Sequence, residues 1–133
     1  MIVRFANSYI DRLFAERDLL GIYQLVGIVA KQRPLAEEFW LFSRMLEWEG
    51  ATRSGIWQYY ECIADDTFER VSRDLDQFGL SDLAEQYRFG QRIWKTPERT
   101  VVLDRWIDAH TREITDAIFH LIAPHRLSLH GPA

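Results

Sequence analysis

Three acidic residues, Glu61, Asp65 and Glu69, follow one another at intervals of four residues. On a continuous α-helix this spacing places their carboxylates on one face, about 6 Å apart along the helix axis. That separation approximates the spacing of phosphates along a nucleic-acid strand. Three neighbouring acidic residues add to this row or flank it: Asp66, Asp74 and Asp76. The six residues therefore form a candidate acidic face that could bind a basic protein.

The alternative interpretation of this face is a solvated helix with internal ion pairs. Arg70 and Arg73 lie four residues from acidic partners, in the pairs Asp66 to Arg70, Glu69 to Arg73 and Arg70 to Asp74. Pairs at this spacing partly neutralise one another on a helix. The spacing alone leaves both interpretations open.

The distribution of charge supports a protein partner over a nucleic acid. Residues 34–89 hold 12 acidic and 5 basic side chains, a net charge of −7, whereas residues 1–33 carry +2 and residues 90–133 carry +1. Direct nucleic-acid binding needs a clustered basic face that contacts phosphates. The sequence therefore predicts a basic partner and no direct contact with nucleic acid.

The residues that could support catalysis or metal binding lack the partners that such chemistry needs. Asp104 and Asp108 lie one helical turn apart and could act as an acid and base pair, but flanking arginines favour a solvated face. The neighbours of Cys62 are acidic, and nearby negative charge weakens a thiol as a nucleophile. The spacing of His120, His125 and His130 puts no two on one turn, and there is no His-Glu-x-x-His pattern. We expect no catalytic residue, no metal site and no cofactor.

The aromatic residues raise one further alternative. Five tryptophans lie at helical spacing among apolar residues, which predicts core positions, and His110 lies on an apolar stripe, where a hydrogen-bonded core histidine is expected. The alternative is a ligand pocket, in a small-molecule-binding protein or a hydrolase that uses this aromatic cluster with His110 or Asp104.

Hydrophobic positions repeat with a period of 3.6 residues and almost nowhere with a period of 2, which predicts an all-α chain. We expect one compact domain over residues 1–123 with six or seven helices, followed by a flexible tail over residues 124–133. Asp18 is expected to cap one helix, Gly79 to end another in a left-handed conformation, and Thr96 with Pro97 to start the last. The expected helical ranges are 3–17, 18–31, 34–50, 56–62, 65–78, 81–94 and 97–122.

The last predicted helix carries apolar residues and one histidine at spacings of four and three. This heptad-like seam is short, so we expect it to pack inside the domain, and a homodimer seam is the alternative. Its positions are Leu103, Ile107, His110, Ile114, Ala117 and Leu121.

No segment has the pattern of a membrane span or a secretory signal. The longest apolar run, residues 19–30, has 12 residues, and about 20 are needed to cross a bilayer. The single cysteine cannot form an intrachain disulfide. We therefore expect a cytoplasmic protein without membrane contact.

The run RSGIWQYY, residues 53–60, resembles the core motif of a bacterial domain family of unknown function that includes a DNA-mimic protein. Members typically show Asn-Gly-Gly-Phe-x-Gln-Tyr-Phe, a helix, a glycine stop and another helix. Gly55, Gln58, Tyr59 and Tyr60 match that run, and Gly79 matches the stop. The matched segments, with the closing helix, cover roughly half the chain, whereas Arg-Ser and Ile replace Asn-Gly and Phe at positions 53, 54 and 56.

The resemblance implies an all-α fold in which the motif residues build a helix junction, with Gln58 bonding backbone groups at the turn. It also implies a regulator that presents carboxylates in place of phosphates. The sequence thus predicts a non-enzymatic protein–protein interaction module that binds a basic protein, such as a transcription factor. An immunity-like or antitoxin-like inhibitor, which would bind a basic toxin through the same face, is the alternative.

Overall fold

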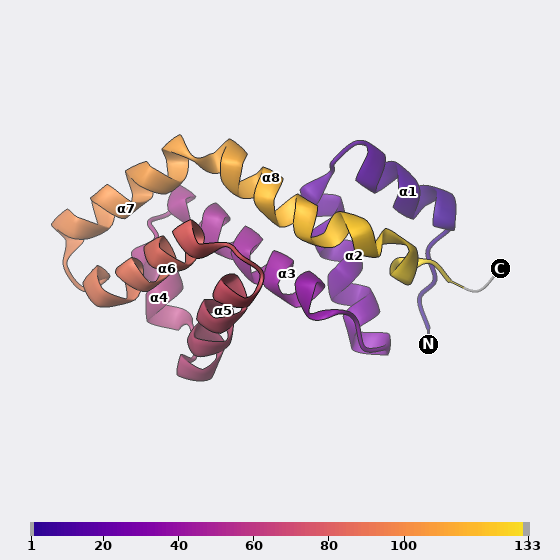
Figure 1. Ribbon diagram of the computed structural model, residues 1–133, viewed down its shortest axis with the longest axis horizontal. Coiled ribbons are helices and arrows are strands. Elements are labelled where there is room, and N and C mark those ends of the chain that lie inside the picture. The colour runs from indigo at the N-terminus through magenta and orange to yellow at the C-terminus, as the bar shows by residue number, and fades with distance from the viewer. Residues whose placement is uncertain (1, 132–133) are drawn as a thin grey trace. The chain divides into compact units, whose positions relative to one another are not determined.

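Residues 2–131 are described in the computed structural model, and this part of the chain consists of helices and their connections, without a strand (Figure 1). The all-α prediction is confirmed. The eight α-helices are α1 (Asn7–Ala15), α2 (Leu19–Gln32), α3 (Glu37–Gly50), α4 (Trp57–Cys62), α5 (Asp65–Gln77), α6 (Ser81–Ile93), α7 (Pro97–Ala109) and α8 (Thr111–Ile122). Two 3-10 helices, η1 (Ala51–Arg53) and η2 (Ala123–Leu129), complete the described elements.

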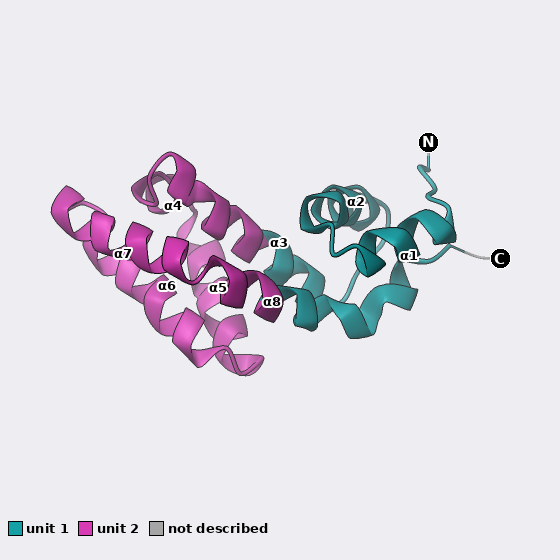
Figure 2. Ribbon diagram, turned by 90° about the horizontal axis from the view of Figure 1, so that it is seen from above, with its two compact units in different colours: residues 1–43, 118–133 teal, residues 44–117 magenta. Residues whose placement is uncertain are grey.

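The chain divides into two compact units, which Figure 2 colours separately. Unit 1 comprises residues 1–43 and 118–133, and unit 2 comprises residues 44–117. The expectation of a single domain over residues 1–123 stays a prediction, because the division describes compactness within the chain. Hydrophobic periodicity identifies the buried face of each helix but not the helix against which that face packs.

Unit 1 is built on α1, which packs against α2 and η2. The side chains of Ile10, Leu13 and Phe14 on α1 are buried. The start of α2 is fixed by Asp18, whose Oδ1 accepts a hydrogen bond of 2.9 Å from the Gly21 N–H. This bond satisfies one of the unpaired N–H groups at the helix start, so the predicted cap is confirmed.

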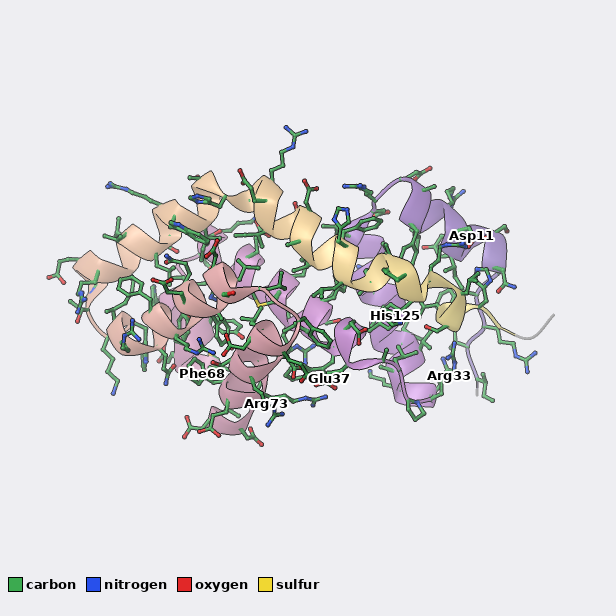
Figure 3. The ribbon with its side chains drawn as sticks, viewed as in Figure 1. Asp11, Arg33, Glu37, Phe68, Arg73 and His125 are labelled. Atoms are coloured by element: carbon green, nitrogen blue, oxygen red, sulfur yellow. The ribbon has the colours of Figure 1, made fainter. Side chains whose placement is uncertain are left out.

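The C-terminal segment of unit 1 is ordered by side chains that the sequence analysis left without partners. The carboxylate of Asp11 accepts from Arg126 and, at 2.7 Å, from His130 Nε2, and the Gly131 N–H donates to Asn7 Oδ1 at 3.1 Å. His125 pairs with the carboxylate of Glu38 on α3. Figure 3 labels both Asp11 and His125. Residues 125, 126, 130 and 131 of the expected flexible tail thus have partners within unit 1, residues 132 and 133 lie outside the described part, and the flexibility itself stays a prediction.

Unit 2 packs α6 against α4, α5 and α7. Its α5 to α6 connection turns at Gly79, which has a φ of +77°. The Leu80 N–H bonds the Leu75 carbonyl at 2.8 Å, and the Gly79 N–H bonds the Asp76 carbonyl at 3.1 Å. These bonds close the end of α5, and a side chain at position 79 would be strained in this left-handed conformation, so the predicted stop is confirmed.

The predicted helix over residues 97–122 is wrong in one respect, because it breaks at His110 into α7 and α8. His110 has a φ of −114° and a ψ of 15°, outside the helical region. Its Nδ1–H donates to the Trp106 carbonyl at 2.7 Å, and Thr111 Oγ1 donates to the Ile107 carbonyl at 3.1 Å. Side chains thus satisfy carbonyls at the end of α7. After the break the fully buried positions of α8 are Ile114, Ile118 and Ile122, and the predicted seam residues 117 and 121 are only partly buried.

The most apolar helix of unit 1, α2, has 14 residues and exposes Leu20 and Ile28 while it buries Ile22 and Val29. It is thus an amphipathic helix rather than a uniformly apolar one. Among residues 2–131, no helix combines the length and the apolar character required to cross a bilayer.

The Asp11 cluster predicts how the stability of unit 1 depends on pH. The hydrogen bond from His130 and, beyond it, the contacts of Arg126 hold the pKa of Asp11 below its ordinary value of 3.8. A carboxylate with a lowered folded-state pKa stabilises the fold above its unfolded pKa and loses that effect as pH falls through the folded pKa. In urea unfolding, Asp11→Asn should therefore be less stable than the wild type at pH 6. This gap should close as pH falls below 3.8.

Asp108→Asn is the control for that experiment, because it removes one negative charge at an exposed site of α7. The Asp11 explanation fails if the gap between wild type and Asp11→Asn has the same size at pH 6 and at pH 2.

Candidate functional site

The predicted row of carboxylates does not continue across Glu61, Asp65 and Glu69, because the helix that carries Glu61 ends before the next one begins. Helix α4 ends at Cys62, and Ile63 is extended, with a φ of −75° and a ψ of 138°. Helix α5 then starts at Asp65. The expected i+4 spacing therefore holds from Asp65 to Glu69 and not from Glu61 to Asp65.

Three carboxylates remain together at the start of α5. The side chains of Asp65, Asp66 and Glu69 are all exposed in its first two turns, and we call them the α5 carboxylates. Asp66 Oδ1 accepts a hydrogen bond of 2.8 Å from the Thr67 N–H. Acidic side chains at this end of a helix are stabilised by the helix dipole. The local sequence thus places three negative charges at the exposed N-terminal end of α5.

The other two residues of the candidate face on α5 have different surroundings. Asp74 is 2% exposed, so its carboxylate lies outside any exposed face, which corrects the expectation. Asp76 is exposed but forms an ion pair with Arg88 of α6. Arg88 also donates to Ser72 Oγ at 2.6 Å and to the Ser72 carbonyl at 3.2 Å. Asp76 therefore joins α5 to α6 and contributes less free negative charge.

The turn before α4 is held by Asp104, a residue that the sequence pattern had placed on a solvated helix face. Gly55 has a φ of +106°, and a Cβ there would lie 2.7 Å from Trp57 Nε1, so glycine is required. Gln58, expected to bond the turn, is exposed. Asp104 Oδ1 instead accepts from the Ile56 N–H at 2.9 Å. Burial raises the pKa of Asp104 above its ordinary value, and the hydrogen bond from Ile56 offsets part of this increase.

Tyr59 and Tyr60 join α4 to its neighbours through a hydrogen-bonded aromatic network. Trp48 Nε1–H donates to the Tyr60 hydroxyl at 2.9 Å, and that hydroxyl donates to the Tyr87 carbonyl at 2.7 Å. The hydroxyls of Tyr59 and Tyr87 lie 2.6 Å apart, and Phe68 stacks on the Tyr87 ring at 5.2 Å. Burial raises the pKa of each of the three tyrosine hydroxyls well above its ordinary value, so all three are neutral. The network is a hydrogen-bonded part of the core. It gives the motif residues Tyr59 and Tyr60 a structural role.

His110, the candidate base of the alternative hydrolase, is held by structural contacts. Its ring stacks on Trp106 with centroids 4.2 Å apart, and its Nδ1–H bonds the Trp106 carbonyl. The same ring lines a pocket of about 360 Å³ with Glu113 and the start of α6. Within residues 2–131, no three His, Cys, Asp or Glu side chains converge in a way that could hold a metal ion.

Sequence reasoning missed a second pocket, in unit 2, which includes Glu61. Trp57 and Glu61 of α4 line it together with Trp94, Lys95, Pro97 and Thr100, and its volume is about 430 Å³. The signal was present in the sequence, because Trp57 and Glu61 are four residues apart and so share a helical face. The contribution from residues 94–100 could not be read from that spacing.

The aromatic network predicts a large effect of one small substitution. Gly90 of α6 is buried, and a Cβ at this position would overlap the ring and hydroxyl of Tyr60. Gly90→Ala should therefore lower the free energy of unfolding by about 1–3 kcal/mol through overpacking, as measured by urea unfolding.

Gly27→Ala is the matched control, since it makes the same change in helix α2, where a Cβ would have no neighbour within 4 Å. It should raise stability by up to about 1 kcal/mol through helix propensity. Equal effects of the two substitutions would contradict the packing of Tyr60 against Gly90.

Comparison with known proteins gives no match to a family model, a curated protein or a solved structure. The resemblance of the run from Arg53 to Tyr60 to a DNA-mimic-containing family stays a prediction.

Proposed function

We propose that this protein is a non-enzymatic interaction module that binds a basic, DNA-binding protein through the α5 carboxylates. The observation that carries this proposal is the exposure of Asp65, Asp66 and Glu69 within two turns of one helix. An i+4 pair such as Asp65 and Glu69 spans about 6 Å along the axis, which approximates the separation of neighbouring phosphates.

The distribution of charge between the units supports this surface. Unit 2 holds 15 acidic and 10 basic residues, a net charge of −5, whereas unit 1 holds 5 acidic and 6 basic residues, a net charge of +1. An excess of one sign on a surface steers a partner of the opposite sign and raises its association rate by about 10-fold to 1,000-fold, most strongly at low salt. The acid of unit 2 thus favours a basic partner.

Two features limit the strength of the surface and set its expected behaviour. The positive end of the α5 dipole, equivalent to about half a charge, offsets part of the three negative charges. Arg70 and Arg73 lie one turn from Asp66 and Glu69 on the same helix. The interaction should therefore depend on steering and on salt more than on many tight ion pairs.

An inhibitor of a basic toxin, of the immunity or antitoxin kind, would use the same carboxylates. The two roles differ in the partner and in what binding prevents. A captured repressor would lose its operator, whereas a captured nuclease would lose its substrate. Identification of the partner separates them.

The test uses a triple variant, Asp65→Asn, Asp66→Asn and Glu69→Gln, in affinity capture from a lysate of the native cells at low and high salt. The wild type should retain a basic protein at low salt and release it at high salt, because exposed charges are screened. With that protein purified, the triple variant should associate at least ~10-fold more slowly and with a weaker dependence on salt.

The matched control is Glu98→Gln, Asp108→Asn and Asp116→Asn, which makes the same three changes at exposed positions of α7 and α8. It should keep the wild-type association rate. The proposal is wrong if both triple variants bind like the wild type, or if both lose binding equally, because the second result would reflect net charge alone.

A further inference from the structure

The pocket beside α4 has walls of a particular chemistry. Its residues come from α4, from the connection between α6 and α7, and from the first turn of α7, all within unit 2. Trp57 leaves 41% of its surface exposed, and Trp94 is partly exposed. At about 430 Å³ the pocket falls in the range of small-ligand sites. Two indoles, a carboxylate and a proline therefore face a space that a ligand can enter.

A positive charge already lies at this site. The Lys95 ammonium lies 5.4 Å from the centroid of the Trp94 ring, which is within the range of a cation–π contact. Glu61 contributes a negative charge to the same pocket. Glu61 and the indole rings together suit a cation, and the exposed Lys95 of the chain itself now supplies one.

We propose that this pocket binds a methylated ammonium group, which displaces Lys95 from the Trp94 ring. An ammonium such as that of lysine has three N–H donors to satisfy, whereas the acceptor side chains of the lining are one carboxylate, Glu61, and the Thr100 hydroxyl, which already donates to the Pro97 carbonyl. A trimethylammonium group has no N–H donor, so its methyl groups can contact the indoles without an unpaired donor. The lining of the pocket therefore favours a methylated cation over the Lys95 ammonium, which now lies beside the Trp94 ring.

The site is independent of the α5 carboxylates, because it contains none of them. Lys95 is exposed, so its movement into water leaves no buried charge behind. Two sources share the required chemistry: a free small molecule of the choline type and the side chain of a trimethylated lysine in a peptide. The probes below separate these sources.

The experiment is an NMR titration of the ¹⁵N-labelled protein that follows the indole N–H signals of its five tryptophans. The probes are choline, an N-acetyl trimethyllysine amide, and 3,3-dimethyl-1-butanol, the uncharged analogue of choline with the same shape. Both cations should shift the Trp57 and Trp94 signals to saturation and leave Trp48, a buried residue of the core, unchanged. Tighter binding of the amide would identify the side chain as the source, and tighter binding of choline the free molecule.

Three substitutions separate cation recognition from apolar contact. Lys95→Gln removes the competing intrachain cation and should tighten binding of choline by ~3-fold or more, whereas Trp57→Ala should weaken it by ~10-fold or more. Glu61→Gln should weaken choline binding and leave the binding of the uncharged analogue unchanged. Lys95 and Glu61 are exposed, so thermal unfolding of Lys95→Gln and Glu61→Gln should stay close to that of the wild type.

The proposal is overturned if the uncharged analogue shifts the two indoles as strongly as choline does. It is also overturned if neither cation shifts them in the wild type or in Lys95→Gln. A loss of binding by the triple variant of the α5 carboxylates leaves this result unaffected, so failure of one proposal is distinguishable from failure of the other.

Discussion

The hydroxyl of Tyr60 is the group on which unit 2 depends. It accepts from Trp48 of α3 and donates to the backbone of Tyr87 of α6, so one oxygen fixes α4 between two other helices. Helix α4 has only six residues, and a helix of that length is unstable in water without tertiary contacts. Because the Trp48 side chain is fully buried, loss of the hydroxyl would leave the Trp48 Nε1–H without its acceptor, at a cost of about 1–3 kcal/mol. The surface residues of α4 thus owe their positions to a bond in the core.

That dependence explains why the same short segment carries both structure and a candidate site. Tyr60 is buried over Gly90, while Trp57 and Glu61 of the same helix line a pocket. A rigid helix holds an exposed indole where a loop would let it collapse onto apolar surface. The turn before α4 adds a second constraint, since Asp104 bonds the Ile56 N–H across 48 positions in sequence.

Sequence reasoning succeeded where a local rule decides the conformation. The Asp18 cap, the Gly79 stop and the α4 range follow from a single side chain, a positive φ and a local hydrophobic pattern, and the structure has all three. It failed where a partner is distant in sequence. The contact of Asp11 with His130 joins residues 119 positions apart, and no spacing rule indicates it. The break at His110 was missed for a related reason, because Leu103, Ile107 and Ile114 fit a continuous helix by period alone.

The candidate acidic face shows how one small conformational change alters a functional interpretation. Two residues outside the helix, Ile63 and Ala64, separate Glu61 from the α5 carboxylates. Period 3.6 treats the whole run as one helix, because neither residue is a helix breaker such as glycine or proline. The consequence is two surfaces with different physics. Exposed carboxylates act at long range and weaken with salt, whereas an indole-lined pocket acts at contact distance and is less affected by it. Binding of a methylated cation in the pocket should therefore persist at high salt. The association of a basic protein with the α5 carboxylates should slow as salt is added.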